Sequence, residues 1–281
     1  MKQLLSIDTN PKTVKGQKYG YMTGVMYLAP ADLAADPTDP NSILANINVC
    51  PMALLAKCKT PCLNGAGRGA FDSVQQARIA KTRRFFTDRA GFMADLVWSI
   101  EALIRKADRA ELIPLVRPNG TSDIRWELIP CVRNMGTRKV PNWVRFSNIM
   151  EAFPGVQFYD YTKITNRKLV QLRDAVTGEL RGGFPANYDL TFSYSDVPAF
   201  APIVARAQAN PVLQRIAVVF RDRNNIPKTF KINGVDGKRK PLKCVDGDDS
   251  DLRHADPSGV VVALYAKGKA RKDVSGFVVN N

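Results

Sequence analysis

Three cysteines lie close together in the segment CPMALLAKCKTPCLNGAGRG, with the spacing C-x7-C-x3-C. They are Cys50, Cys58 and Cys62. Thiolates are the ligands of iron–sulfur clusters and of soft metals such as zinc. A cluster held by three thiolates leaves one iron open for a small-molecule ligand. The triplet therefore predicts a metal centre, and an iron–sulfur cluster is the first expectation.

Two other interpretations of the triplet remain open. A mononuclear zinc site needs a fourth ligand, which Cys131, Cys244 or the single histidine, His254, could supply. The sequence lacks the paired C-x2–4-C units that are typical of structural zinc fingers. Free cysteine is also among the most buried residue types, so the three side chains could simply pack in the core.

The segments that must position these cysteines alternate between strand and helix patterns. The apolar run YGYMTGVMYLAP precedes the triplet, and residues 72–109 follow it with helical spacing, interrupted at Gly91. Helical character recurs in NWVRFSNIMEAF, NRKLVQLRDAV and VPAFAPIVARAQ. Apolar runs predict six main strands at 22–30, 112–118, 156–162, 189–195, 215–221 and 260–266, with short extra strands near 229–234 and 242–246.

This alternation indicates parallel βαβ units and an α/β fold. We expect one domain over residues 1–281, a single, partly open, parallel (β/α)6-type barrel with its helices outside. A basic arm, residues 1–20, precedes the barrel, and residues 240–281 form an acidic loop and the last strand. An open doubly wound sheet is the alternative architecture.

Polar residues follow the predicted strands, at the edge where parallel α/β sheets place their sites. We expect catalysis from Asp123, Asp160, Lys163 and Asp196. We expect cofactor binding from Asn119, Ser122, Tyr161 and Ser193. Asp123 and Asp196 would orient a ribose or an amine, and Lys163 would pair with a carboxylate or phosphate. Tyr161 and Tyr194 would stack on a base. Capping of the following helices is the alternative role for these residues.

A glycine-rich stretch, NGAGRGAF, precedes the long helical segment. The backbone N–H groups of Gly65 and Gly67, together with a helix N-terminus, could hold the phosphate or carboxylate of a cofactor. Arg68 would add a fork of hydrogen-bond donors. The sequence contains no Walker motif, and a flexible connection is the alternative interpretation.

The chain carries 41 Lys and Arg residues against 26 Asp and Glu, a formal net charge of +15. Such a charge favours a polyanionic partner, most simply nucleic acid. Lysines and arginines close to aromatic side chains suit the binding of single-stranded nucleic acid. The cationic side chains pair with its phosphates, and its nucleobases stack on the aromatic rings. The expected contacts are Lys12, Lys15, Arg78, Lys81, Arg84 and Lys267. A solvated charged surface is the alternative.

An acidic segment, VDGDDSDLRHADPSG, stands out in this basic chain. It contains Asp246, Asp248, Asp249, Asp251 and Asp256. Hard oxygen ligands at alternate positions suit magnesium, and two divalent ions could support phosphodiester cleavage. The alternative is a turn held by aspartate caps and by a pair with Arg253.

The cysteine count and the apolar runs bear on the compartment. Five cysteines, an odd number, argue against a secreted disulfide framework. The amino-terminal residues lack the apolar core of a secretory signal, and no apolar run has the length of a transmembrane helix. We therefore expect reduced thiols, no membrane partner and a cytoplasmic location.

The order of elements resembles the start of a radical S-adenosylmethionine enzyme barrel, with a strand, a three-cysteine loop, a helix and further βα units. The resemblance implies an iron–sulfur cluster on the triplet and S-adenosylmethionine as cosubstrate, although that superfamily usually has the spacing C-x3-C-x2-C. The chain also resembles a family of phage proteins. That resemblance lies in CPMALLAKCKTPCLNGAGRG, RPNGTSDIRWE, FYDYTK and VDGDDSDLRHADPSG.

Taken together, these features predict a phage-type iron–sulfur protein, similar to radical S-adenosylmethionine enzymes, that acts on or with nucleic acid in the host cytoplasm. One alternative is a basic, non-catalytic nucleic-acid-binding protein of a mobile element. Another is a magnesium-dependent nuclease built on Asp246, Asp248 and Asp251. The nature of the metal, whether iron, zinc or magnesium, separates the three hypotheses.

Overall fold

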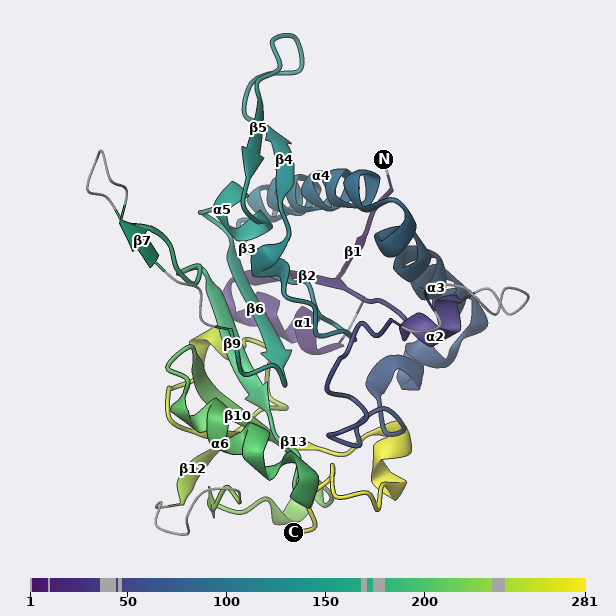
Figure 1. Ribbon diagram of the computed structural model, residues 1–281, viewed down its shortest axis with the longest axis vertical. Coiled ribbons are helices and arrows are strands. Elements are labelled where there is room, and N and C mark those ends of the chain that lie inside the picture. The colour runs from purple at the N-terminus through teal and green to yellow at the C-terminus, as the bar shows by residue number, and fades with distance from the viewer. Residues whose placement is uncertain are drawn as a thin grey trace.

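The computed structural model of the chain describes residues 2–9, 11–35, 44, 47–167, 171–173, 180–233 and 241–281. Parts of the predicted arm 1–20, of NRKLVQLRDAV and of the stretches 229–234 and 240–281 lie outside these residues. A large sheet, flanking helices and two projecting hairpins make up the described structure (Figure 1).

The described strands form one nine-stranded sheet and two separate hairpins. The order across the sheet is β1 (Leu5–Ile7), β2 (Tyr21–Met26), β3 (Ile113–Arg117), β6 (Gln157–Thr162), β9 (Tyr188–Ser193), β10 (Leu213–Phe220), β13 (Val261–Tyr265), β12 (Leu242–Asp246) and β11 (Thr229–Phe230). The end strands β1 and β11 pair antiparallel, and all other neighbours are parallel. The predicted α/β class, with a large and mostly parallel sheet, is confirmed.

The six main predicted strands correspond to β2, β3, β6, β9, β10 and β13. Their order in the sheet is also their order along the chain, so each connection moves the chain in the same direction. A doubly wound sheet requires a reversal of direction, which these six strands do not show. Among the described residues the sheet is not closed into a barrel, because β1 and β11 form its two ends.

Two consecutive helices form the predicted helical segment 72–109. They are α3 (Asp72–Thr87) and α4 (Arg89–Arg109). The break falls at Asp88 and not at Gly91, because the Asp88 side chain accepts the Gly91 N–H at 2.9 Å and caps α4. The other helices are α1 (Pro11–Gly16), α2 (Ala31–Ala34), α5 (Ile149–Ala152) and α6 (Ala201–Ala209). Among the described helices, none combines the length and apolarity that a membrane crossing requires.

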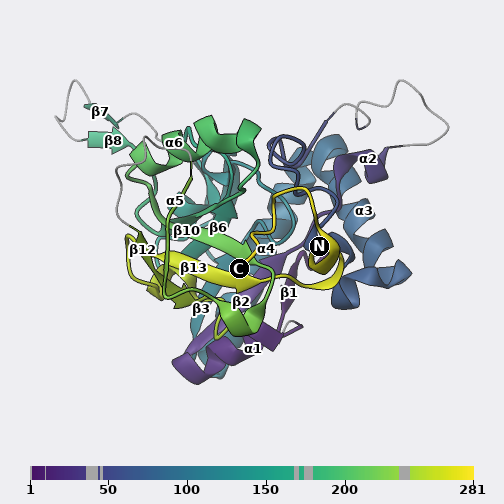
Figure 2. The same cartoon turned by 90° about the horizontal axis from the view of Figure 1, so that it is seen from below.

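The two faces of the sheet are covered differently. Alternate strand residues such as Phe158, Phe192 and Val218 join the main apolar core with side chains of α3, α4, α5 and α6. The opposite face carries Leu115 and Tyr159, against which Leu252 of the acidic segment packs. Helix α1 lies on this second face, and Figure 2 shows α1 and α6 on opposite sides of the sheet.

Two hairpins lie outside the main sheet and replace predicted helical segments. They are β4 (Cys131–Asn134) with β5 (Trp143–Phe146), and β7 (Gln171–Arg173) with β8 (Leu180–Gly182). The prediction of a helix through NWVRFSNIMEAF is wrong over β5 and right only from α5 onward. The prediction for NRKLVQLRDAV is wrong at β7. Pairing with the other strand of the hairpin overrides local helical spacing in both places. The helix predicted in VPAFAPIVARAQ is confirmed as α6.

Candidate functional site

The cysteine segment follows β2 and runs across the carboxyl ends of several strands. In the loop after β3, the backbone N–H of Asp123 donates to the Val49 carbonyl at 2.7 Å. Beyond β9, the Ser195 hydroxyl donates to the Ala56 carbonyl at 2.9 Å. The segment is thus tied to the ends of two non-adjacent strands, at the edge where parallel sheets place their sites.

The three cysteines of this segment are free thiols and partly buried. The Cys50 thiol contacts the Thr121 carbonyl at 3.8 Å, which fixes it beside the loop that follows β3. The Cys62 sulfur accepts the Asn64 N–H at 3.4 Å. Cys50 and Cys58 also pack against the edge of the main apolar core. The Cys50 thiol therefore has both apolar and polar neighbours.

Lys163 brings the three cysteines into one electrostatic environment. Its ammonium group donates to the Ser193 carbonyl at 3.0 Å and hydroxyl at 2.5 Å, and lies 4.9 Å from the centre of the Phe277 ring. Burial lowers the pKa of Lys163, and nearby charges oppose that effect. These charges belong to Cys58, Asp123, Cys50 and Cys62. The predicted metal ligands and this predicted catalytic residue thus lie within electrostatic range of one another.

Burial favours the neutral thiol form of Cys50 and Cys58. It raises the pKa of Cys50 well above the ordinary value, with added repulsion from Asp123 and the other cysteines. It also raises the pKa of Cys58, against which the Lys163 ammonium acts. Metal binding requires thiolates, so binding here would release protons to solvent.

The three thiols are of the ligand type that binds soft metals and iron–sulfur clusters. Three thiols from one loop lie in a partly buried environment beside a cation, which suits anionic sulfur ligands. Within the part of the chain that the structure describes, no group of three His, Cys, Asp or Glu side chains is already arranged around one point as a metal site. Ligation by the triplet would therefore require rotation of the thiols toward a common centre.

The residues considered as a fourth zinc ligand have neighbours in other parts of the fold. Cys131 is buried on β4, with Glu151 and Arg133 as its charged neighbours. Cys244 lies on β12. His254 packs edge-on against Tyr21, at 5.2 Å between ring centres, on the second face of the sheet.

Asp123 joins a buried ion network that the sequence did not reveal. Its carboxylate accepts the Lys163 backbone N–H at 2.7 Å, the Thr162 hydroxyl at 2.7 Å and the Arg167 guanidinium at 3.0 Å. Arg167 is fully buried and also holds both oxygens of the buried Glu127, at 2.9 and 2.6 Å. Glu127 ends the segment RPNGTSDIRWE, but no pattern in the sequence pairs it with Arg167, so only the fold identifies this network. The network fixes the backbone from which the Lys163 side chain extends to Ser193.

Asp160 lies in a second buried network, two residues before Thr162. Its carboxylate accepts the backbone N–H of Asn119 at 2.8 Å and the Tyr188 hydroxyl at 2.7 Å. Burial raises the pKa of Asp160 to about 7. The Asn119 side chain in turn accepts the Ser122 hydroxyl at 2.8 Å and the Trp126 indole N–H at 3.0 Å. These predicted site residues come together, and together they stabilise the loop after β3.

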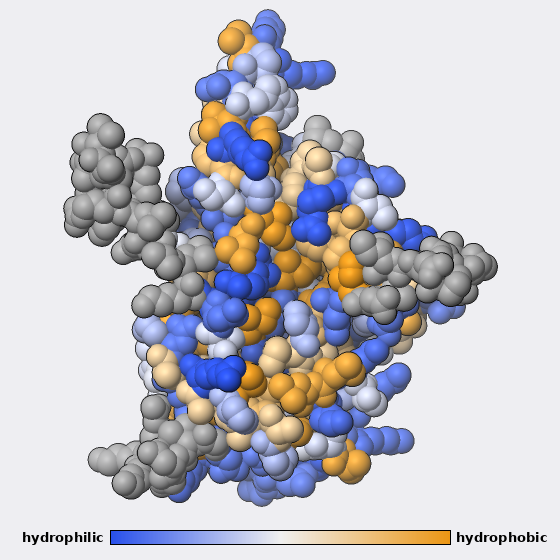
Figure 3. Space-filling model, in the orientation of Figure 1, coloured by the Kyte–Doolittle hydropathy of each residue, from blue (hydrophilic) through white to orange (hydrophobic). Residues whose placement is uncertain are grey.

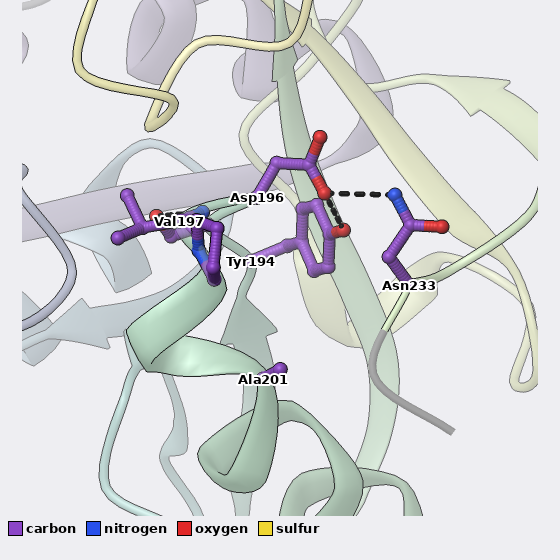
Figure 4. Close-up of a pocket in the computed structure, with 7 residues that line it drawn as sticks. Tyr194, Asp196, Val197, Ala201 and Asn233 are labelled. Atoms are coloured by element: carbon purple, nitrogen blue, oxygen red, sulfur yellow. Dashed lines mark hydrogen bonds between the residues drawn. The ribbon is translucent and has the colours of Figure 1, made fainter. Parts of the chain in front are cut away.

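A cavity of about 240 Å³ opens beside Asp196, at the carboxyl end of β9. Its walls are Tyr194, Ser195, Asp196, Val197, Pro198, Ala201 and Asn233. The Asp196 carboxylate accepts the Tyr194 hydroxyl at 2.6 Å and the Asn233 amide at 2.9 Å (Figure 4). Its backbone N–H donates to the Gly276 carbonyl at 3.0 Å. Asp196 therefore lies in a pocket that adjoins the cysteine segment through Ser195.

Tyr161 lies on the other side of the sheet from Asp160 and Thr162, because neighbouring strand residues face opposite ways. The Arg117 guanidinium lies over its ring, 4.8 Å from the centre. Tyr161 packs there with Ala217 and Val262. Tyr194, by contrast, belongs to the main core.

The glycine-rich stretch forms two short turns before α3. Gly67 has a positive φ of 54°, which favours glycine. Gly69 lies so close to its neighbours that a Cβ there would be 2.6 Å from the Asn64 carbonyl oxygen and 2.9 Å from an Arg78 nitrogen. Arg78 itself is buried and donates to the Asn64 carbonyl at 2.5 Å. In this structure Arg78 fastens the glycine-rich stretch, which includes Gly65 and Arg68, to α3.

Most of the other predicted phosphate contacts also bind groups of the chain itself. Lys12 and Lys267 both pair with Asp248. Lys81 donates to the Leu4 carbonyl at 3.4 Å, and Arg84 pairs with Asp88 and Asp95. Lys15 lies exposed on α1. Five of the six residues, all except Lys15, are thus shown in contact with groups of the chain itself.

The acidic segment is held by hydrogen bonds and ion pairs. The Asp246 carboxylate accepts the Asp248 backbone N–H at 2.7 Å, as an aspartate turn does. Asp251 accepts Arg117 at 2.9 Å and the Tyr159 hydroxyl at 3.2 Å. The remaining pairs are Tyr19 with Asp249 and Arg253 with Asp256. These contacts match the structural alternative for the segment, in which aspartates cap turns and neutralise basic neighbours.

A comparison with known proteins supplies one match. A family model described as gene product 88 matches residues 3–281, which is nearly the whole chain. No curated protein and no solved structure matches the chain significantly. The matched region includes the cysteine segment, the two buried networks and the acidic segment.

Proposed function

The chain belongs to the gene product 88 family, a phage-type protein family, and from this premise we propose that it is an iron–sulfur protein, similar to radical S-adenosylmethionine enzymes, that acts on or with nucleic acid. Cys50, Cys58 and Cys62 are the proposed ligands of the cluster. The family match covers the three cysteines together with all the strands that surround them.

One observation carries the proposal. Three partly buried thiols from the loop after the first parallel strand lie within electrostatic range of Lys163, at the carboxyl edge of a sheet whose six main strands follow one another in chain order. In such sheets the carboxyl edge is where sites form. Cysteines with a purely packing role have no need of a shared buried cation.

Each part of the site has a stated role in this proposal. When bound, the cluster would supply an electron to a small molecule, such as S-adenosylmethionine, on its open iron. Lys163 stabilises the negative charge of the thiolates, and Asp123 holds the Lys163 backbone in place. The cavity at Asp196 offers a carboxylate and an amide to a polar group of the cosubstrate. The net charge of +15 supports nucleic acid as the substrate or partner.

Metal analysis of protein purified and reconstituted without oxygen tests this function. We expect a brown protein with iron and sulfide bound in stoichiometric amounts, and loss of both in Cys50→Ser, Cys58→Ser and Cys62→Ser. Cys244→Ser is the matched control, since Cys244 is also partly buried but lies on β12. A colourless, iron-free wild-type protein after reconstitution rejects the cluster.

A second candidate, a non-catalytic nucleic-acid-binding protein, has a specific observation in its favour. Asp123, Asp160 and their partners satisfy one another inside the protein, as a structural network would. This candidate predicts salt-dependent binding of nucleic acid that survives Asp196→Asn and needs no metal. The magnesium-nuclease alternative is not proposed further, because Asp248 and Asp251 already pair with Lys12, Lys267 and Arg117.

A further inference from the structure

The hairpin of β4 and β5 projects from the body of the protein, at the top of Figure 1. Its strands pair only with each other among the described strands. A two-stranded hairpin is marginally stable in water, so its base needs anchors. Cys131 is buried there, and the Arg133 guanidinium donates to the Ala152 carbonyl at 2.5 Å while lying 4.1 Å from the centre of the Phe153 ring.

The tip of the hairpin is held in one shape by its own polar groups. The Asn134 side-chain oxygen accepts the backbone N–H groups of Gly136 at 2.9 Å and Asn142 at 2.8 Å. The Thr137 N–H donates to the Val140 carbonyl at 3.0 Å. A Cβ at Gly136 would lie 2.3 Å from the Val140 carbonyl oxygen, so the turn requires glycine. The hairpin is therefore an ordered projection and not a loose loop.

One face of the hairpin points away from its anchors. Residues directly opposite on paired strands share a face, and so do residues two apart on one strand. Asn134 pairs with Trp143, and Val132 pairs with Arg145, so these four side chains share one face. Trp143 is 67% exposed and Val132 48%. Arg145 is exposed as well. The anchoring residues Cys131 and Arg133 belong to the opposite face.

The charge of the hairpin has one sign. Between Cys131 and Phe146 the sequence holds three arginines and one lysine, and no acidic residue. Arg138 and Lys139 lie exposed at the tip. Figure 3 shows blue and orange side chains together on this projection. An exposed apolar ring beside cations complements a partner that carries both phosphates and flat bases.

We propose that the β4–β5 hairpin is an arm that holds single-stranded nucleic acid, with Trp143 stacking on a base and Arg138, Lys139 and Arg145 contacting phosphates. The inference deepens the nucleic-acid part of the proposed function, and it places that contact on residues other than the six predicted from the sequence. A single strand fits better than a duplex, because the bases of a duplex are already stacked and cannot cover an exposed indole.

Fluorescence and affinity measurements on metal-free protein test the stacking. With a labelled oligothymidylate, we expect Trp143→Ala to weaken binding about tenfold and Trp143→Phe to retain most of the affinity, since a phenyl ring also stacks. The wild-type tryptophan emission should fall on binding, and this decrease should be lost in Trp143→Phe. Unchanged affinity in Trp143→Ala overturns the proposal, as does a duplex of equal length binding more tightly than the single strand.

The salt dependence of the affinity tests the phosphate contacts. Removal of two contacts to a single strand should reduce the slope of log affinity against log salt by about 1.4, so we expect this change in Arg138→Ala/Lys139→Ala. Arg206→Ala/Lys228→Ala is the charge-matched control, because both residues are exposed and lie on other elements. Equal slopes in the two double variants overturn the assignment to the hairpin.

These measurements are independent of the cluster. The hairpin variants are expected to bind iron as the wild type does, and Cys58→Ser is expected to bind the oligonucleotide as the wild type does when both lack metal. A protein that binds single strands through Trp143 but never acquires iron supports the hairpin and rejects the cluster. If the protein binds iron and Trp143→Ala keeps the wild-type affinity for the oligonucleotide, the cluster is supported and the role of the hairpin is rejected.

Discussion

Asp123 accepts the backbone N–H of Lys163 at 2.7 Å, and this bond connects the buried ion network to the cysteine cluster. The carboxylate lies in the loop after β3 and the lysine just beyond the end of β6. The contact therefore joins the ends of two neighbouring parallel strands. The Lys163 ammonium group reaches Ser193 at the end of β9, which extends the connection to a third strand.

Replacement of Lys163 should make the cysteines less reactive. The ammonium group lowers the pKa of Cys58 and Cys50 against the effect of burial, so Lys163→Met should raise both values further. We expect iodoacetamide to modify these two thiols more slowly at pH 8.5, as measured by mass spectrometry of the metal-free protein. Lys59→Met is the matched control, because Lys59 lies on the same loop and pairs with Asp32. Equal rates in both variants would contradict a role for Lys163 in the thiol environment.

The carboxyl group of Asp160 should make stability depend on pH. Its folded-state pKa is about 7 and the ordinary value is 3.8, so between these values the folded state retains a proton that the unfolded state releases. Stability from this group is therefore greatest below about pH 4, falls as pH rises toward 7, and is constant above that. The loss amounts to a few kcal/mol, since one pKa unit corresponds to about 1.4 kcal/mol.

Urea unfolding at pH 5 and pH 8 measures this effect. Asp160→Asn cannot ionise, so we expect its free energy of unfolding to fall less between the two pH values than that of the wild type. Asp108→Asn is the control, because Asp108 is exposed at the end of α4. The same pH dependence in wild type and Asp160→Asn would show that Asp160 does not titrate in this range.

Removal of Arg167 should destabilise the protein strongly. The guanidinium is fully buried between Glu127 and Asp123, so Arg167→Met leaves two buried carboxylates without their cation. We expect a loss of about 3–5 kcal/mol in the free energy of unfolding. Arg125→Met is the comparison, since Arg125 also contacts Glu127, at 3.3 Å, but has a partly exposed side chain. Its expected cost is below about 1 kcal/mol, and a similar loss for both variants would refute the special role of Arg167.

Two glycines of the cysteine segment should differ sharply in their tolerance of alanine. A Cβ at Gly69 would lie within 2.6 Å of the Asn64 carbonyl oxygen, whereas a Cβ at Gly65 would meet nothing within 4 Å. We expect Gly69→Ala to cost about 1–3 kcal/mol, the usual cost of forced overpacking, and Gly65→Ala to be close to neutral. Thermal unfolding of the two variants checks this difference. Equal stability would mean that the Arg78–Asn64 contact does not confine the glycine-rich stretch.

The sequence pattern was sufficient to predict the main strands of the large sheet, but it was insufficient to predict the two hairpins. Strands β6 (QFYDYT) and β9 (YDLTFS) are short and rich in aromatic and β-branched residues, and turn-forming residues flank them, which favours strands. The segment NWVRF has apolar residues that also match a helix, and its strand conformation depends on pairing with Cys131–Asn134. Such pairing is non-local, so no pattern within the segment could reveal it.

For the candidate site, the sequence by itself determined the residue types, namely a thiol triplet, polar residues after each strand and a large positive charge. Only the tertiary structure decided which of these residues meet. It brought the triplet within electrostatic range of Lys163, enclosed Asp123 and Asp160 in buried networks, paired the acidic segment with Lys12 and Arg117, and exposed Trp143 on a projecting hairpin. The physical reason is that strand order and burial set these contacts, and both depend on the packing of segments that are far apart along the chain.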